Sequence, residues 1–157
     1  MYHKNKKTFE GQRLVPKENY RKDVISFISD ILEENIEISN AISISLNVSS
    51  SAEDTAFMAK ICLVDEKGDT YHLRQSACAL CIKDGFKESY VPNTIKNITF
   101  ETAPIFINIR KGCRLRVDIS SSDYPSYAVH PNTNSIWSHE KNPVTAVQKI
   151  YGGIISF

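Results

Sequence analysis

The chain has 157 residues, of which 41% are hydrophobic and 24% charged, and its formal net charge is +1. This length favours one domain with a substantial core, and the balanced charge gives no reason to expect nucleic acid or an anionic membrane as a partner. The basic N-terminal stretch has no apolar core and no apolar run approaches the ~20 residues of a membrane span, so we expect neither a secretory signal nor a membrane segment, and a cytoplasmic location.

The N-terminal third contains an arm and two candidate elements. Residues 1–21 are polar and irregular, and we expect an arm that lies on another surface. Residues 24–32 carry apolar side chains at helical spacing and, read alone, predict a helix, although their β-branched content favours a strand. Residues 36–49 have period two, which predicts one amphipathic strand with a dry face. Its apolar positions are Ile36, Ile38, Ile42, Ile44, Leu46 and Val48.

The middle of the chain predicts a hairpin followed by a cysteine pair. Two strands within 59–73 are joined by a turn at 65–69 that contains Gly68. Cys78 and Cys81 then have the CxxC spacing of zinc and redox sites. The sequence has no second CxxC and no HxxxH to complete a zinc site. With Cys62 and Cys113, we therefore expect four free thiols, buried or half-buried, and neither a metal nor a cofactor.

The last third predicts further short strands. Residues 97–109 alternate around Pro104, which marks a bulge, a strand start or an edge. A turn at 110–112 leads into a strand at 113–120, and 145–157 predict a strand pair or one strand bent at Gly152 and Gly153. Many short strands, without long helices between them, predict an all-β antiparallel sandwich.

Ser122, Asp123 and His130 lie within about a dozen residues and raise the hypothesis of a catalytic triad. No glycine is followed two residues later by serine, so the G-x-S-x-G elbow is missing from the sequence. Serine, aspartate, asparagine and proline also form turns that follow strands. His130, which precedes Pro131, is expected on the surface in extended backbone. We therefore predict a structural loop and no catalytic residue in this chain.

Two stretches resemble a known family. Residues 112–134, GCRLRVDISSSDYPSYAVHPNTN, resemble the C-terminal domain signature of the X-prolyl dipeptidyl peptidases and their CocE/NonD relatives (cocaine esterase-like, glutaryl acylase-like). The matching positions are Gly112, Arg114, Arg116, Ser120, Ser121, Ser122, Asp123, Tyr124, Pro125, Pro131, Asn132 and Thr133. Residues 23–73 are similar to the family's entry into the same domain, through Ser49, Ser50, Ser51, Ala52, Asp54, Thr55 and Phe57. Cys113, Val129 and Asn134 depart from the family's His, Arg and Gly.

The resemblance covers about residues 22–157 and implies a jelly-roll β-sandwich of the galactose-binding-domain-like type. It implies that 24–28 is a strand and 29–33 a turn, against the helical spacing. It also implies a non-catalytic C-terminal domain that packs on and shapes an α/β-hydrolase catalytic domain, in cis or in trans. The family's nucleophile, acid and base lie in that other domain, so none is carried onto this chain. The implied structural or interface loop comprises Ser122, Asp123, Tyr124, Pro125, Pro131, Asn132 and Thr133.

The alternative is a freestanding galactose-binding-like module for carbohydrate or protein partners. Trp137 is the one tryptophan that could stack on a sugar, and a Trp that covers the core edge is the simpler interpretation. The parent enzyme's substrate and the oligomeric state, including a homo-oligomer, stay open. For the loop we predict that Asp123 accepts backbone or hydroxyl hydrogen bonds, that Tyr124 lies against the sandwich edge and that Pro125 fixes the exit.

Overall fold

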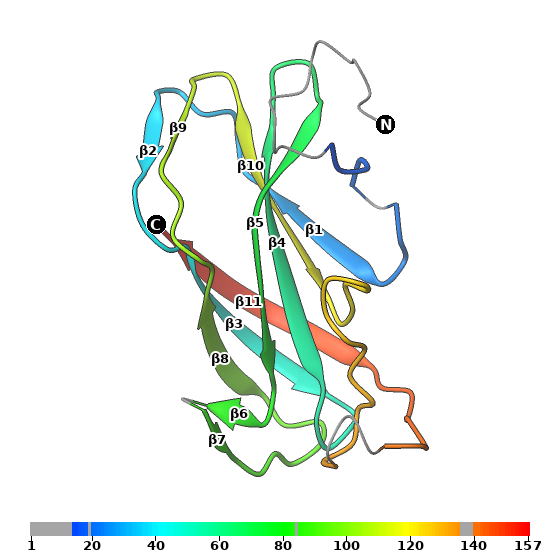
Figure 1. Cartoon of the computed structure of the whole chain (residues 1–157). Helices are drawn as coiled ribbons and strands as arrows, with labels where there is room; N and C mark the ends of the chain where they lie inside the picture. Colours follow the sequence, from blue (N-terminus) through cyan, green and yellow to red (C-terminus); the bar gives the residue numbers. More distant parts are fainter. Residues whose placement is uncertain (1–13, 19, 84, 136–139) are drawn as a thin grey trace.

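The computed structural model describes residues 14–18, 20–83, 85–135 and 140–157, and these residues form strands and no helix (Figure 1). No helix in that part of the chain is therefore long and apolar enough to cross a membrane. The strands are β1 (Val24–Ile28), β2 (Ile36–Ile38), β3 (Ser43–Ser50), β4 (Ala56–Val64), β5 (Thr70–Ala79), β6 (Ile82–Lys83), β7 (Phe86–Lys87), β8 (Lys96–Glu101), β9 (Ile107–Ile109), β10 (Arg114–Ser120) and β11 (Gln148–Ser156).

Two antiparallel sheets form the sandwich. The four-stranded sheet has the order β1-β10-β4-β5, and the three-stranded sheet has the order β11-β3-β8. Short pairs, β2 with β9 and β6 with β7, extend the two ends (Figure 1). Apart from the β4–β5 hairpin, consecutive long strands alternate between the two sheets. The predicted all-β jelly-roll sandwich is confirmed, and so is the hairpin with its turn around Gly68 at φ 82°.

The core lies between the two sheets and follows the period of two. In β3 the even positions are buried while Ser43, Ser45 and Asn47 face outward. In β4 and β10 the odd positions, such as Ile61 and Val117, join this core, while even positions, such as Arg116, are buried on the other face of the sheet. The buried cluster comprises Ile38, Ile42, Ile44, Leu46, Val48, Phe57, Ala59, Ile61, Leu73, Leu80, Ile98, Phe100, Ile105, Ile109, Cys113, Val117 and Ile119.

The helical spacing of residues 24–32 is a wrong prediction, and the strand that the family resemblance implied is confirmed. Val24–Ile28 pairs antiparallel with β10, with Val24 opposite Ser120. The Ser29 amide then donates to the Leu115 carbonyl at 2.9 Å, which continues the pairing beyond the strand. Tertiary pairing therefore overrides a periodicity that is carried by only a few residues.

The single strand predicted over 36–49 is two strands. β2 pairs with β9, whereas β3 pairs with β11 and β8. Between them, the Asn40 side-chain oxygen accepts a hydrogen bond from the Ala41 amide at 2.8 Å, and the Ile42 amide donates to Thr102 Oγ1 at 3.1 Å. Ile42 stays in the core, so the apolar alternation continues across a break in the strand.

The C-terminal segment is one bent strand. β11 pairs with β3 throughout and shifts register between Ile150 and Gly152, where φ is 147°. At Gly153, a Cβ would lie 2.5 Å from the carbonyl oxygen of Ser45. The bulge and the close approach of the two backbones explain both glycines.

Candidate functional site

The loop after β10 crosses the outer face of the four-stranded sheet. Asp123 Oδ1 accepts a hydrogen bond at 2.9 Å from Lys60 Nζ, and both side chains are largely buried. The prediction that its carboxylate takes backbone or hydroxyl donors is wrong, because the outward side of β4 places an ammonium group directly under the loop. The backbone carbonyl of Asp123 accepts from the Tyr127 amide at 3.1 Å, which closes the turn.

The tip of this loop points into solvent. Tyr124 is 77% exposed, so the expectation that it lies against the sandwich edge is wrong. The Tyr124–Pro125 peptide bond is cis. Ser122 is engaged on both sides: its hydroxyl accepts from Arg21 Nη2 at 2.9 Å, and its carbonyl accepts from Ser120 Oγ at 2.9 Å. This end of the loop therefore holds the N-terminal arm.

His130 is buried, with 3% of its surface exposed, so the prediction of a surface histidine is wrong. Its Nδ1 accepts a hydrogen bond from the Asn132 amide at 2.9 Å, which assigns the proton of the neutral ring to Nε2. Nε2 faces Asp54 Oδ2 at 3.5 Å. The proline after His130 restricts its backbone and carries no information about burial, which is why the sequence argument failed.

Asp54 is an ionised carboxylate inside the protein. Oδ1 accepts from the Thr55 amide at 2.8 Å and from the Cys81 amide at 3.0 Å. Burial alone would raise the pKa of Asp54, but the interaction with His130 and the hydrogen bonds from these two amides outweigh burial and lower the pKa below its ordinary value. The carboxylate thus fixes the start of β4 to the segment that follows β5.

Asn132 joins the two stretches that resemble the family. Its φ of 61° lies in the left-handed region that asparagine tolerates. Its Oδ1 accepts from Thr55 Oγ1 at 2.8 Å and its Nδ2 donates to the Val144 carbonyl at 2.9 Å. Gln148 Nε2 donates to the same Thr55 hydroxyl at 2.9 Å. We call Asp54, Thr55, His130, Asn132 and Gln148 the polar cluster.

The polar cluster connects the predicted loop to residues from other segments. The Pro131 carbonyl accepts a hydrogen bond from the Val144 amide at 3.0 Å, and Thr133 Oγ1 donates to Glu140 Oε2 at 3.0 Å. The sequence placed Asn132 in the loop but left Gln148 out, and assigned no role to Thr55. Asp54 and Thr55 already matched the second family stretch, and that match was the available signal.

The hypothesis of a catalytic triad fails on geometry. Ser122 is bound to Arg21, Asp123 to Lys60, and His130 faces Asp54, so the three residues have three separate partners. One nitrogen of the His130 ring accepts a backbone N–H and the other faces a carboxylate. Neither is placed to take a proton from a serine hydroxyl.

The outer face of the four-stranded sheet also buries a salt bridge under the N-terminal arm. Arg116 and Asp118, 0% and 4% exposed, form two hydrogen bonds of 2.7 Å. Arg116 Nη1 donates to the Pro16 carbonyl at 2.9 Å, and the Val15 amide donates to the Thr70 carbonyl at 2.9 Å. Burial opposes the charge of Arg116, yet Asp118 raises the pKa of its guanidinium. The described end of the arm is therefore attached to the sheet.

The four cysteines are free and buried or half-buried, as predicted. Burial raises the pKa of Cys62 and Cys78 to about 12 and that of Cys81 to about 11, so these thiols are protonated at neutral pH. Within residues 14–18, 20–83, 85–135 and 140–157, no group of three His, Cys, Asp or Glu side chains could hold a metal ion. Trp137 lies outside the described residues.

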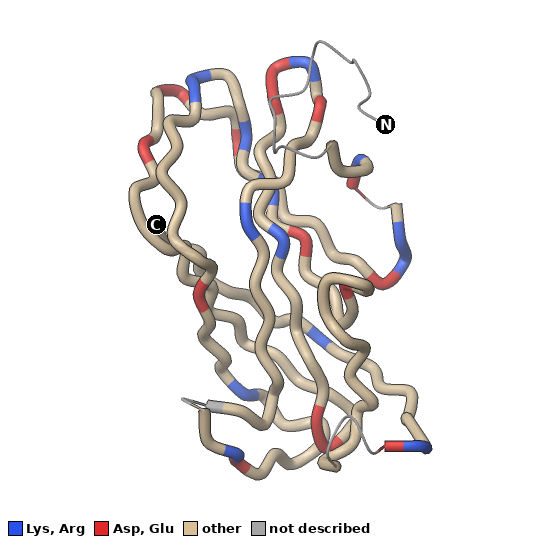
Figure 2. The backbone as a smooth tube through the Cα atoms, viewed as in Figure 1, with Lys and Arg blue, Asp and Glu red and all other residues tan. Residues whose placement is uncertain are grey.

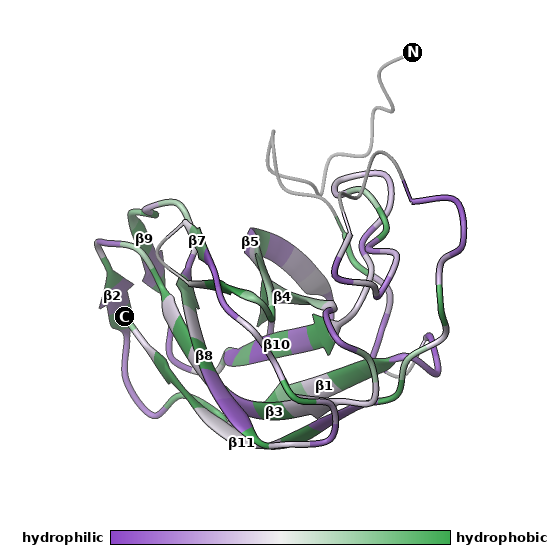
Figure 3. Cartoon of the chain, turned by 90° about the horizontal axis from the view of Figure 1, so that it is seen from below, coloured by the Kyte–Doolittle hydropathy of each residue, from purple (hydrophilic) through white to green (hydrophobic). Residues whose placement is uncertain are grey.

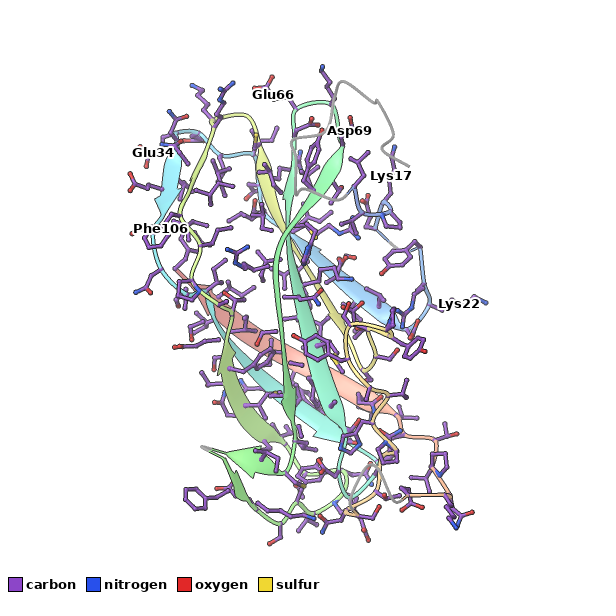
Figure 4. The ribbon with its side chains drawn as sticks, viewed as in Figure 1. Lys17, Lys22, Glu34, Glu66, Asp69 and Phe106 are labelled. Carbon is purple, nitrogen blue, oxygen red and sulfur yellow. The ribbon has the colours of Figure 1, made fainter. Side chains whose placement is uncertain are left out.

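A cavity of about 710 Å³ lies at the end of the sandwich where the β4–β5 turn faces β9. Figure 2 shows charged residues gathered at this turn, and Figure 4 shows Glu66 and Asp69 on it. The Asp65 carboxylate accepts hydrogen bonds from the Lys67 and Asp69 amides, both at 2.9 Å. A Cβ at Gly112 would lie 2.6 Å from Glu66 Oε1. These acidic residues therefore stabilise the turn or pack against the neighbouring turn.

Ser122, Asp123 and His130 bind other parts of the same jelly-roll sandwich, as expected for a non-catalytic domain. The chain belongs to the family of the X-Pro dipeptidyl-peptidase C-terminal non-catalytic domain, whose family model matches residues 2–153. The family that the two sequence stretches predicted is confirmed.

The chain is similar to one region of several larger hydrolases. It is 31% identical over 149 residues to the cocaine esterase of Rhodococcus sp. (strain MB1 Bresler), covering 85% of this chain and 24% of the esterase. An α-amino acid ester hydrolase structure has a TM-score of 0.77 at 22% identity, and an aminopeptidase from a marine sediment archaeon, Thaumarchaeota archaeon, has a TM-score of 0.78 at 18%. Each covers 85% of this chain and 24% of the larger protein, and at these identities they show the fold alone.

Proposed function

We propose that this chain is a non-catalytic β-sandwich domain that packs on an α/β-hydrolase catalytic domain, in cis or in trans, and helps to shape its substrate cleft. Acyl or peptidyl hydrolysis is then carried out by the other domain. The observation that carries this proposal is the family match over residues 2–153, together with the fact that the chain spans about a quarter of the length of the relatives it matches.

The side chains of the loop support a structural contribution. Asp123, Ser122 and His130 all hold elements of this domain together, and none is placed to attack a substrate. The polar cluster fixes the loops at one end of the sandwich, so the domain presents a rigid body to a partner. Four free thiols fit a reducing compartment, and we propose a cytoplasmic location.

The test uses the Rhodococcus cocaine esterase as the catalytic partner. One variant lacks the region that matches this chain, and a second carries this chain in its place. We expect the deletion to lose ester hydrolysis and the chimera to regain it, because the sandwich completes the folded enzyme. A chimera as inactive as the deletion, while the chain itself is folded by circular dichroism, would contradict the proposal. The isolated chain should not hydrolyse a nitrophenyl ester, with or without Ser122→Ala.

A further inference from the structure

The two long sides of the sandwich are closed differently. On one side, Ser76 Oγ on β5 donates to the Glu101 carbonyl at 2.6 Å, and the Arg74 guanidinium donates to the Pro104 carbonyl at 3.1 and 3.3 Å. On the other side, β1 and β11 are the edge strands of their sheets and share no hydrogen bond in the described structure. Figure 3 shows both strands running along this same side, with hydrophobic residues on each.

An apolar groove of about 390 Å³ opens on this second side and reaches the core. Its floor includes Ile38 and Ile61, which are fully buried, while Phe27 and Phe157 at its rim are 46% and 51% exposed. We call it the β1–β11 groove, and its walls are formed mainly by Phe27, Leu32, Leu115, Ile155 and Phe157. The groove is lined almost entirely by apolar side chains, and its floor belongs to the core.

The outer faces of the two sheets differ from the groove. The outer face of the four-stranded sheet is covered by the arm and by the loop after β10. The outer face of the three-stranded sheet presents Ser45, which is hydrogen-bonded to Asn97 and Thr99, and beside them the exposed Ile154. Phe106, next to β9, is 80% exposed and points into solvent (Figure 4).

The charge of the segment that supplies Phe27, Leu32 and Ile36 to the groove restricts what can occupy it. Residues 24–37 contain Asp30, Glu33, Glu34 and Glu37 and no lysine or arginine. Glu34 points away from the sandwich at this end (Figure 4). In a twofold dimer the same patch would face itself and bring these acidic groups together. This segment keeps an excess of acidic groups even with Lys111, whose amide donates to Asn35, beside it. Its charge therefore disfavours a second copy and favours a partner whose apolar centre is flanked by basic residues.

We propose that the β1–β11 groove is the surface on which this domain docks, and that its occupant is an apolar segment of the α/β-hydrolase catalytic domain flanked by lysine or arginine. This inference rests on the proposed function, which gives the catalytic domain as the partner, while the position of the groove comes from the structure. The family match and the length of the relatives support this partner, because about three-quarters of each relative (100% − 24% covered = 76%) lies outside the region that matches this chain.

The experiment introduces a charge into the groove of the cocaine esterase chimera described above. Phe27→Asp and Phe157→Asp place a carboxylate at its rim, and Phe157 lies outside β11 and is half-exposed, so its substitution should spare the fold. Phe86→Asp is the matched control, because Phe86 is 77% exposed on β7, at the other end of the sandwich (Figure 1). We expect both groove variants to shorten the half-life of esterase activity at 37 °C by roughly tenfold or more, with the control within about twofold of the parent chimera.

Separate measurements distinguish the outcomes. Groove variants that match the control in half-life would overturn the docking surface while leaving the proposed function intact. An inactive parent chimera would overturn the proposed function, and this inference with it. Melting of each isolated domain checks the fold, and if Phe27→Asp is unfolded, Phe157→Asp decides. Sedimentation of the isolated chain that shows a dimer, abolished by Phe157→Asp, would assign the groove to a second copy and also overturn the proposal.

Discussion

Replacing Thr55 by valine removes the hydroxyl at the centre of the polar cluster with almost no change in volume. This hydroxyl donates to Asn132 Oδ1 at 2.8 Å and accepts from Gln148 Nε2 at 2.9 Å, and the residue is fully buried. Each bond contributes about 0.5–1.5 kcal/mol net, so the substitution should cost about 2 kcal/mol. A domain of this size loses about 2–4 °C of melting temperature per kcal/mol, which gives a decrease of about 4–8 °C.

Thermal unfolding followed by circular dichroism measures this change, with Thr99→Val as the control. Thr99 is exposed and donates to Ser45 on the sheet surface, so its substitution should change the free energy of unfolding by no more than about 0.5 kcal/mol. A Thr55→Val protein that melts within about 1 °C of the parent would refute the reasoning that this cluster stabilises the fold.

A double-mutant cycle then tests whether Thr55 and Asn132 act together. Asn132→Gly removes the side chain while keeping a residue that adopts φ 61° without strain. We expect the double variant to lose about 1 kcal/mol less than the sum of the two single variants, because both single changes delete the same hydrogen bond. Additive losses would show that the two family stretches do not stabilise each other through this bond.

Three further predictions concern other parts of the fold. Because the folded pKa of Asp54 lies below its ordinary value, the ionised carboxylate stabilises the fold fully above pH ~3.8, and this stabilisation is lost as the pH falls below that value. Asp54→Asn should therefore lower the free energy of unfolding at pH 7 and reduce the decrease in that free energy between pH 5 and 2, which urea unfolding would measure. Arg116→Ala should cost about 3–5 kcal/mol by leaving Asp118 buried without its partner, whereas an Arg116→Met, Asp118→Leu double variant should recover most of this; a double variant as unstable as the single one would contradict that explanation. Gly153→Ala should destabilise the pairing of β11 with β3, since its Cβ would meet backbone at 2.5 Å, and hydrogen exchange that stays as slow as in the parent along β11 would argue against it.

The sequence predicted the sandwich because its strands alternate and its turns carry glycine. It could not decide the structure of 24–32, where the spacing of a few apolar residues fits a helix and only pairing with β10 makes a strand. Nor could it separate β2 from β3, since Ile42 continues the alternation through the break. Periodicity reports which side chains are buried and does not report which strands they pair with.

The candidate site was predicted in part for a related reason. The loop residues were found by their turn-forming types, but Asp123 and His130 have partners far away in the sequence, Lys60 and Asp54. Thr55 and Asn132 are 77 positions apart. Contacts of this kind depend on topology, which local patterns do not contain. The family resemblance identified both sequence stretches but could not show the hydrogen bond between Thr55 and Asn132 that joins them.

The described part of the arm has a practical consequence for anyone who produces this domain. A recombinant fragment that begins at residue 22, at the predicted domain boundary, would lose the Pro16 carbonyl that Arg116 binds and the Val15 bond to β5. It would also lose Arg21, which holds Ser122. Water would then reach a salt bridge whose two side chains are now almost completely covered. Expression should therefore start upstream of residue 14, and a shorter fragment is expected to be less soluble and easier to digest with protease.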